Sequence, residues 1–180
     1  AEVLQREPEI LERLQAISGR RLRSERIRCH GDLHLGQVLV WGRDPVFIDF
    51  EGEPARSLAD RRVRRSPLRD VAGMVRSFHY ASQFAWRELA ESQAAGLGTD
   101  LEAWARAWYL WTASAYLNAY SQTAGEGGLL PADPEEYRFL LDVFMLDKAF
   151  YELAYELDNR PLWVDIPLKG ILEMPGSSGD

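Results

Sequence analysis

Two aspartates and a glutamine in the first third of the chain have the types and spacing that phosphoryl transfer needs. Asp32 and Gln37 lie in the segment 30–37 (HGDLHLGQ), and Asp49 follows in 48–54 (IDFEGEP). The reaction uses one carboxylate close to the attacking hydroxyl and further hard oxygen ligands for Mg²⁺. We therefore expect Asp32 to orient and deprotonate a substrate hydroxyl, and Gln37 and Asp49 to hold Mg²⁺ against nucleotide phosphates.

The residues between these positions predict the element that brings them together. Two short β-prone runs, 38–41 (VLVW) and 46–48 (VFI), flank the turn-forming segment 42–45 (GRDP). They predict a β-hairpin with Gln37 at its entrance and Asp49 at its exit, so that both lie at the same end. Glu51 and Glu53 follow directly, and we expect Glu51 beside the metal and Glu53 in contact with substrate.

These segments resemble a known kinase superfamily. His-Gly-Asp-x-His followed by an Asp on the next hairpin is similar to the aminoglycoside phosphotransferase-like kinases, with Gln37 where most members have Asn. Within that superfamily, 30–37, 48–54 and 66–74 look most like bacterial maltokinases, often fused to trehalose synthase, and the similarity continues in 147–156 and 159–163. The resemblance implies ATP and Mg²⁺ as cofactors and phosphorylation of maltose at its anomeric hydroxyl. A related branch with the same signatures acts on glucosamine, and this alternative stays open.

The resemblance also implies a fold and a domain organisation. We expect a mostly helical α+β protein, the C-terminal lobe of a protein-kinase-like fold, with the β-hairpin placed against a helical bundle. Residues 1–174 would form this lobe and 175–180 a flexible tail. The N-terminal lobe, which in such kinases covers the phosphates, is expected to be absent upstream of His30. The isolated chain is then expected to bind ATP very weakly and to be inactive.

A predicted helix late in the chain is the candidate for sugar binding. Lys148, Glu152, Tyr155, Glu156 and Asn159 recur at intervals of three or four residues and can share one helical face. Carboxylates can accept hydrogen bonds from sugar hydroxyls, while an aromatic ring covers the apolar face of the sugar. The alternative from helix geometry alone is a solvated face with Lys–Glu pairs and tyrosines that fill the core.

Four further residues are expected to support or complete the catalytic loop. His30 is a catalytic-loop residue that we expect to fix the loop by hydrogen bonds, and His34 either supports the loop or approaches the phosphates. Asp70, at the start of a predicted helix, matches a position that organises the catalytic loop in kinases of this type, and Arg69 precedes it. A structural role is favoured for both, since an acid in a first helical turn also suits the helix dipole.

Helix signals elsewhere predict a bundle. Leu4, Ile10, Leu11, Leu14 and Ile17 have broadly helical spacing and predict one helix that ends at 18–19 and packs under the catalytic loop. Ser66-Pro67 would open a helix to about Gln93 with Val71, Met74, Val75, Phe78 and Ala81 inward, and capping signals at 99–102 and 133–136 would open two more.

Composition is that of one soluble domain. The chain has 180 residues, 46% of them hydrophobic and 27% charged, and no apolar run approaches the roughly 20 residues of a membrane span. The net charge of −7 argues against a nucleic-acid partner, because phosphate backbones require a basic surface. No signal-peptide pattern opens the sequence and Cys29 is the single cysteine, so we expect a cytoplasmic protein without an internal disulfide.

The same residues allow two other classes of function. His30, Asp32 and His34 could begin a metal-hydrolase centre, but only His79 remains as a further imidazole and it falls inside a predicted helix. The other hypothesis is a non-catalytic, kinase-like binding module. Retention of Asp32, Gln37 and Asp49 argues against it.

Overall fold

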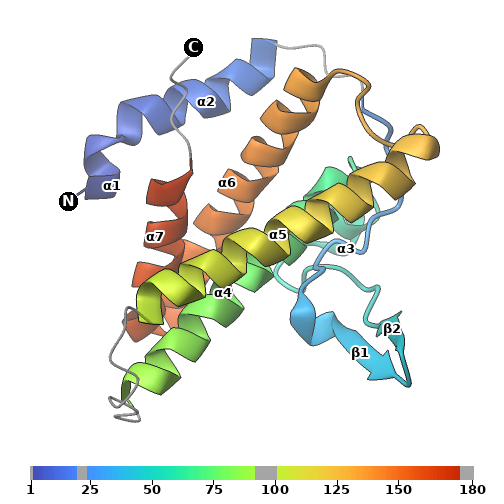
Figure 1. The fold of residues 1–180 in the computed structure, drawn as a ribbon. Coiled ribbons are helices and arrows are strands. Elements are labelled where there is room, and N and C mark those ends of the chain that lie inside the picture. Colours follow the sequence, from blue (N-terminus) through green and yellow to red (C-terminus); the bar gives the residue numbers. More distant parts are fainter. Residues whose placement is uncertain (1, 20–23, 92–100, 175–180) are drawn as a thin grey trace.

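Three long helices form the centre of the protein, and a small β-hairpin projects from them (Figure 1). The computed structural model describes residues 2–19, 24–91 and 101–174. The elements in chain order are α1 (Glu2–Gln5), α2 (Glu7–Gly19), the 3-10 turn η1 (Leu35–Gln37), β1 (Val38–Trp41), β2 (Asp44–Phe47), α3 (Leu58–Arg61), α4 (Leu68–Glu91), α5 (Leu101–Glu126), α6 (Pro134–Asn159), the 3-10 turn η3 (Pro161–Trp163) and α7 (Asp165–Glu173). The expected mostly helical fold with one β-hairpin is confirmed, but the hairpin projects from the bundle and its strands are largely exposed instead of packing against the helices.

Helix α4 is the centre of the core because other elements pack on several of its faces. It contacts α5, α6, α7 and η1. Four of its predicted inward residues, Val71, Met74, Val75 and Phe78, are buried, and Ala81 is partly buried. Burial extends beyond the predicted stripe to polar side chains, including Arg76 and His79. A helix surrounded on several faces cannot place its polar residues only toward solvent, so each of these needs a partner inside the protein.

The helix starts follow the capping signals where the structure describes them. The Asp133 side chain accepts a hydrogen bond from the amide of Glu135 at 3.0 Å and caps α6. The Ser66 hydroxyl accepts one from the amide of Leu68 at 3.4 Å, at the start of α4. The predicted cap at 99–100, the extension of α4 to Gln93 and the tail 175–180 lie outside the described residues.

The hairpin differs from its prediction in the turn. Val38 pairs with Phe47 and Trp41 with Asp44, so only Gly42 and Arg43 form the turn, and Gly42 adopts a left-handed φ of 66°. Segment 44–45, predicted as turn, belongs to β2. Proline is tolerated there because β2 is an edge strand of a two-stranded sheet, where a missing amide donor costs little.

The N-terminal helix is broken and lies elsewhere than predicted. A new helix begins at Glu7 after a turn at Arg6, and Pro8 fits in its first turn because proline has no amide hydrogen to donate to the preceding turn. Contacts join α1 to α7 and α2 to α6, and Ile10 is buried in a cluster with Leu146 and Ile171. The placement under the catalytic loop was therefore wrong; this segment covers α6 and α7 (Figure 1). Within the described residues, no helix combines the length and apolar character needed to cross a membrane.

Candidate active site

The loop that carries Asp32 is fixed to the start of α4. Both oxygens of the Asp70 carboxylate accept hydrogen bonds, from the amide of His30 at 2.6 Å and from the amide of Gly31 at 2.8 Å. Burial raises the pKa of Asp70, while these backbone amides favour its charged form. The contacts support the structural role expected of Asp70, and Arg69 lies partly buried beside it.

His30 lies under the loop and belongs to its support. Its side chain is buried, and its Nε2 lies 2.7 Å from the carbonyl oxygen of Ile48, at the exit of the hairpin. Its Nδ1 accepts a longer contact of 3.4 Å from the amide of Asp32, and its ring packs against Phe50 at 4.8 Å. Because both ring nitrogens have partners within the protein, His30 connects the catalytic loop to the hairpin instead of facing the cavity described below.

Gln37 and Asp49 meet at the end of the hairpin. The amide of Ile48 donates to the carbonyl of Gln37 at 3.0 Å, and the Gln37 side chain donates to an Asp49 carboxylate oxygen at 2.9 Å. Asp49 has a φ of 61°, in the left-handed region that non-glycine residues rarely adopt but that Asp tolerates better than most. The hairpin therefore brings the two predicted metal ligands together at one end.

This pair fits a Mg²⁺ site that relies on a nucleotide for its remaining ligands. Mg²⁺ prefers oxygen and is commonly bound by one or two carboxylates together with phosphates and water. Within the described ranges, no three His, Cys, Asp or Glu side chains lie close enough to form a metal cluster. Glu51 is exposed and does not complete such a cluster with Asp32 and Asp49. His79, the further imidazole that a metal-hydrolase centre would need, lies inside the helical bundle, so the structure does not support the metal-hydrolase hypothesis.

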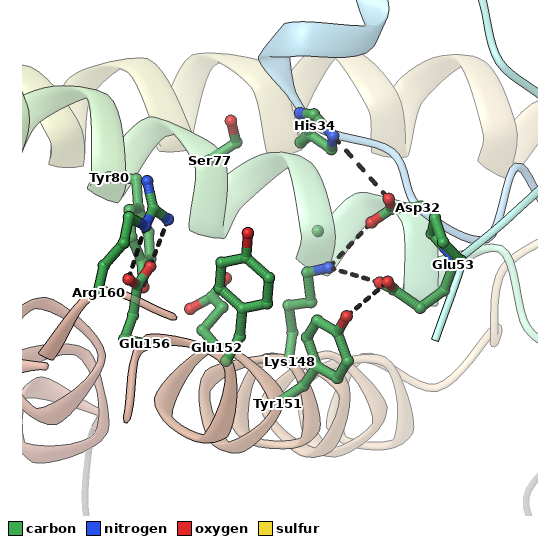
Figure 2. A pocket seen from close by; sticks show the side chains of 13 residues that line it. Asp32, His34, Glu53, Ser77, Tyr80, Lys148, Tyr151, Glu152, Glu156 and Arg160 are labelled. Carbon is green, nitrogen blue, oxygen red and sulfur yellow. Dashed lines mark hydrogen bonds and ion pairs between the residues drawn. The ribbon is translucent and has the colours of Figure 1, made fainter. Parts of the chain in front are cut away.

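A cavity of about 460 Å³ opens beside Asp32, between the catalytic loop, α4 and α6 (Figure 2). Carboxylates, bases and tyrosines from these elements face one another across it. Its lining consists of Asp32, His34, Glu53, Pro54, Gly73, Ser77, Tyr80, Lys148, Tyr151, Glu152, Tyr155, Glu156 and Arg160. The cavity thus contains five residues predicted for substrate binding, Glu53, Lys148, Glu152, Tyr155 and Glu156, together with Asp32 and His34. Asn159, expected on the same helical face, does not line it; it is exposed, and its side-chain amide donates to the carbonyl of Tyr155 at 2.9 Å.

Lys148 links Asp32 to the cavity wall. Its ammonium lies 3.1 Å from an Asp32 oxygen and 3.5 Å from a Glu53 oxygen, and the Tyr151 hydroxyl donates to the other Glu53 oxygen at 2.5 Å (Figure 2). Burial alone would raise the pKa of Asp32, but Lys148 and then His34 outweigh it, so the pKa lies below its ordinary value. His34 Nε2 is 4.0 Å from the other Asp32 oxygen. Asp32 is therefore held as a carboxylate with a fixed orientation.

Farther along α6, Glu152 and Glu156 each have an arginine partner. Arg76, whose side chain is 1% exposed, donates to one oxygen of Glu152 through Nε at 2.9 Å and Nη2 at 2.7 Å. Burial raises the pKa of Glu152 despite this partner. Glu156 accepts from Arg160 at 2.6 and 2.9 Å and from the Tyr80 hydroxyl at 3.3 Å. Ion pairs within the protein thus fix both carboxylates at the cavity.

Sequence reasoning missed several residues of this site. Arg76 and Tyr80 lie on the predicted buried helix α4, and Tyr151 and Arg160 on or just after α6. Helical spacing could have indicated two of them, because Tyr151 follows Lys148 by three positions and Arg160 follows Glu156 by four. Arg76 gave no such signal, since its partner lies on a helix far away in the sequence.

Comparisons with known proteins give a consistent set of relatives. No protein-family model matches the chain. It is 33% identical to a glucosamine kinase of Mycolicibacterium smegmatis over 144 residues, which are 77% of this chain and 32% of that protein. It is 27% identical to a glucosamine kinase of Streptacidiphilus jiangxiensis over 154 residues, 86% of this chain and 32% of that protein. The chain spans about a third of the length of these curated relatives.

Glucosamine kinases are also among the solved structures that match this chain in fold. A glucosamine kinase matches with a TM-score of 0.78 at 22% identity, over 96% of this chain and 40% of that one. A glucosamine kinase in complex with glucosamine, ADP and inorganic phosphate matches with a TM-score of 0.65 at 24% identity, over 81% and 34%. At these identities the solved structures show the fold alone. The names of the curated relatives are those of sugar kinases and agree with the glucosamine alternative, not with the maltokinase and trehalose-synthase interpretation. The chain is related in sequence to glucosamine kinases and shares their kinase-like fold.

Proposed function

We propose that this chain is the catalytic-loop lobe of an ATP-dependent sugar kinase whose acceptor is glucosamine. The observation that carries the proposal is the position of Asp32. Its carboxylate faces a cavity of about 460 Å³, and the same segment of chain leads to the paired oxygen ligands Gln37 and Asp49. In this proposal one side chain orients an acceptor hydroxyl, and two others hold the phosphates through a metal ion.

Each part of the site has a role in this proposal. Asp32 accepts the hydrogen bond of the sugar hydroxyl and orients its oxygen, and Lys148 keeps the carboxylate in place. Gln37 and Asp49 supply oxygen ligands for Mg²⁺, which when bound neutralises phosphate charge. The rings of Tyr80, Tyr151 and Tyr155 provide apolar surface for the sugar ring.

The charge of the cavity supports an amino sugar over maltose. Four carboxylates, Asp32, Glu53, Glu152 and Glu156, line it together with Lys148 and Arg160, and Arg76 pairs with Glu152 from behind the wall, which leaves one carboxylate in excess. Glucosamine carries an ammonium group when protonated, whereas maltose is neutral. An excess of carboxylates in a partly desolvated cavity favours the cation, because electrostatic interactions are stronger there than in water. The names of the relatives point the same way.

The proposal leaves part of the nucleotide site to another region of protein. The chain spans about a third of its curated relatives, and we place the contacts to adenine and most phosphate contacts on a preceding N-terminal lobe. The 180 residues alone are then expected to show negligible turnover.

The test is an acceptor comparison. ADP release is measured with Mg²⁺-ATP and either glucosamine or maltose, using a protein in which this chain follows the N-terminal part of a glucosamine kinase relative. Turnover with glucosamine and a much lower kcat/KM with maltose is the expected result. Preference for maltose would return the assignment to maltokinase, and no turnover with either sugar, by a protein that is folded and binds ATP, would refute a sugar kinase of this specificity.

A further inference from the structure

A second cavity lies inside the helical bundle, on another face of α4 from the site described above. It measures about 270 Å³ and is bounded by α4, α5, α6 and α7. Val75, Arg76 and His79 of α4 line it, whereas Gly73, Ser77 and Tyr80 of the same helix line the first cavity. The remaining lining is mostly apolar and comes from Tyr109, Leu110, Ala113, Leu117, Leu141, Met145 and Met174, among others.

His79 is the unexplained group of this cavity. Its side chain is 2% exposed, and neither ring nitrogen has a hydrogen-bond partner in the structure. The nearest acid, Glu173, has an oxygen 3.9 Å from Nε2, too far for a hydrogen bond, and the ring of Tyr109 meets the imidazole edge to face at 5.1 Å. Burial, followed by the charges of Arg76 and Lys169, lowers the pKa of His79 to about 3, so the imidazole is neutral. A buried polar group without a partner costs free energy unless something else supplies the hydrogen bond.

The lining selects a chemical class of ligand. The Arg76 guanidinium already binds Glu152, so it is not a free cation. Arg106, Asp142 and Glu173 are exposed and have charges of both signs, which gives no preference for an anion or a cation. The buried part therefore offers apolar surface and one neutral imidazole. A hydroxyl group suits either nitrogen of a neutral imidazole, because it can donate to the bare nitrogen or accept from the protonated one.

We propose that this cavity is a second ligand site, which binds a small, largely apolar molecule through a hydroxyl group that hydrogen-bonds to His79. The competing explanation is that water alone fills the cavity and satisfies the imidazole, as buried waters often do. The two explanations predict different results for small aromatic probes. A ligand site that uses His79 binds an apolar ring with a hydroxyl more tightly than the same ring without one, whereas a cavity filled by water alone does not.

The experiment uses the chain's three histidines as reporters. The whole chain, with ¹⁵N-labelled histidine, is titrated with phenol and separately with toluene, and the imidazole signals are followed by NMR. Because His34 lines the first cavity and His79 the second, the signals show which cavity a probe enters. We expect saturable shifts of His79 but not of His34, with phenol binding about tenfold more tightly than toluene, the worth of one hydrogen bond.

Two variants examine the role of His79. In His79→Leu, calorimetric titration should give phenol and toluene the same affinity, because the hydrogen-bonding group is gone. Gln83→Leu is the matched control: Gln83 is also buried on α4 with an unpartnered side-chain oxygen, but it does not line the cavity, so the preference for phenol should persist. If His79→Leu does not fold, the affinities of the wild-type chain for phenol and toluene still show whether the cavity recognises a hydroxyl group.

Three results would overturn the proposal. Absence of any saturable His79 shift would mean that the cavity holds water only. Equal affinity of the wild-type chain for phenol and toluene would show that His79 does not recognise a hydroxyl. A shift of His34 without one of His79 would place the probe in the first cavity.

Discussion

The buried ion pair between Arg76 and Glu152 should dominate the stability of the bundle around the site. Removing one member of a buried pair leaves an uncompensated charge and costs about 3–5 kcal/mol, whereas replacing both by apolar residues is often neutral. The Arg76 side chain is 1% exposed and that of Glu152 12%, so this pair belongs to the buried class. We expect Arg76→Met to lower the free energy of unfolding by about 3–5 kcal/mol, and the double variant with Glu152→Leu to recover to within about 1 kcal/mol of wild type.

The pH dependence of the free energy of unfolding provides an independent test of the same ion pair. Burial raises the pKa of Glu152 above its ordinary 4.5, so the folded state holds this proton more tightly than the unfolded state. The resulting contribution to stability is present at low pH and is lost as the pH rises through the folded-state pKa. Without Arg76 that pKa rises further. Arg76→Met should therefore lose stability more steeply than wild type as the pH rises from about 4.5.

Urea unfolding followed by circular dichroism measures both effects. Arg87→Met is the matched control, because it removes an arginine from the same helix whose partner Asp165 is 49% exposed, and we expect a loss of at most about 1 kcal/mol. A loss below about 1 kcal/mol for Arg76→Met, or pH profiles parallel to wild type, would refute the reasoning.

Three further substitutions test the site itself. Asp32→Asn in the active protein should lower kcat by about 10²–10⁴-fold. The free energy of unfolding should change by less than about 1 kcal/mol, because Lys148 keeps Glu53 as a partner. An unchanged kcat would show that Asp32 takes no part in the reaction. Tyr151→Phe removes the hydroxyl that donates to buried Glu53 at 2.5 Å and should cost about 1.5–3 kcal/mol in urea unfolding, and a loss under about 0.5 kcal/mol would contradict this. Gly73→Ala would place a methyl group 2.6 Å from the carbonyl oxygen of Leu33, so the catalytic loop should move and kcat should fall at least about tenfold. Unshifted NMR signals of the backbone amides in 30–37 would contradict this movement of the loop.

Local rules explain why the hairpin end could be predicted from the sequence. Strand propensity and turn residues specify a hairpin over a short segment, and pairing then places Gln37 and Asp49 side by side without any distant contact. The error in the turn was equally local, because Asp44 and Pro45 are turn formers that an exposed edge strand tolerates. The capping residue of α6 was predictable for the same reason.

The interior of the site depends on pairs that are distant in the sequence. Arg76 would be assigned to solvent by helical periodicity, yet it is buried because Glu152 approaches from α6. The N-terminal helix was misplaced because its partners lie at the other end of the chain: the Arg6 guanidinium donates to the carbonyl of Leu172 at 2.7 Å. Such pairings follow from how helices pack, which single-helix patterns do not encode.

Lys148 limits the way in which Asp32 can act. By lowering the pKa of Asp32, it makes this carboxylate a weaker base, so early removal of a proton from a sugar hydroxyl is unfavourable. Phosphoryl transfer through a loose transition state does not need an early alkoxide, because bond formation to the nucleophile has advanced little when the barrier is crossed. The same contact fixes the direction of the carboxylate, which helps to align the attacking oxygen. The geometry therefore favours Asp32 as the group that orients the hydroxyl and accepts its proton late, and Lys148 as the residue that holds it there.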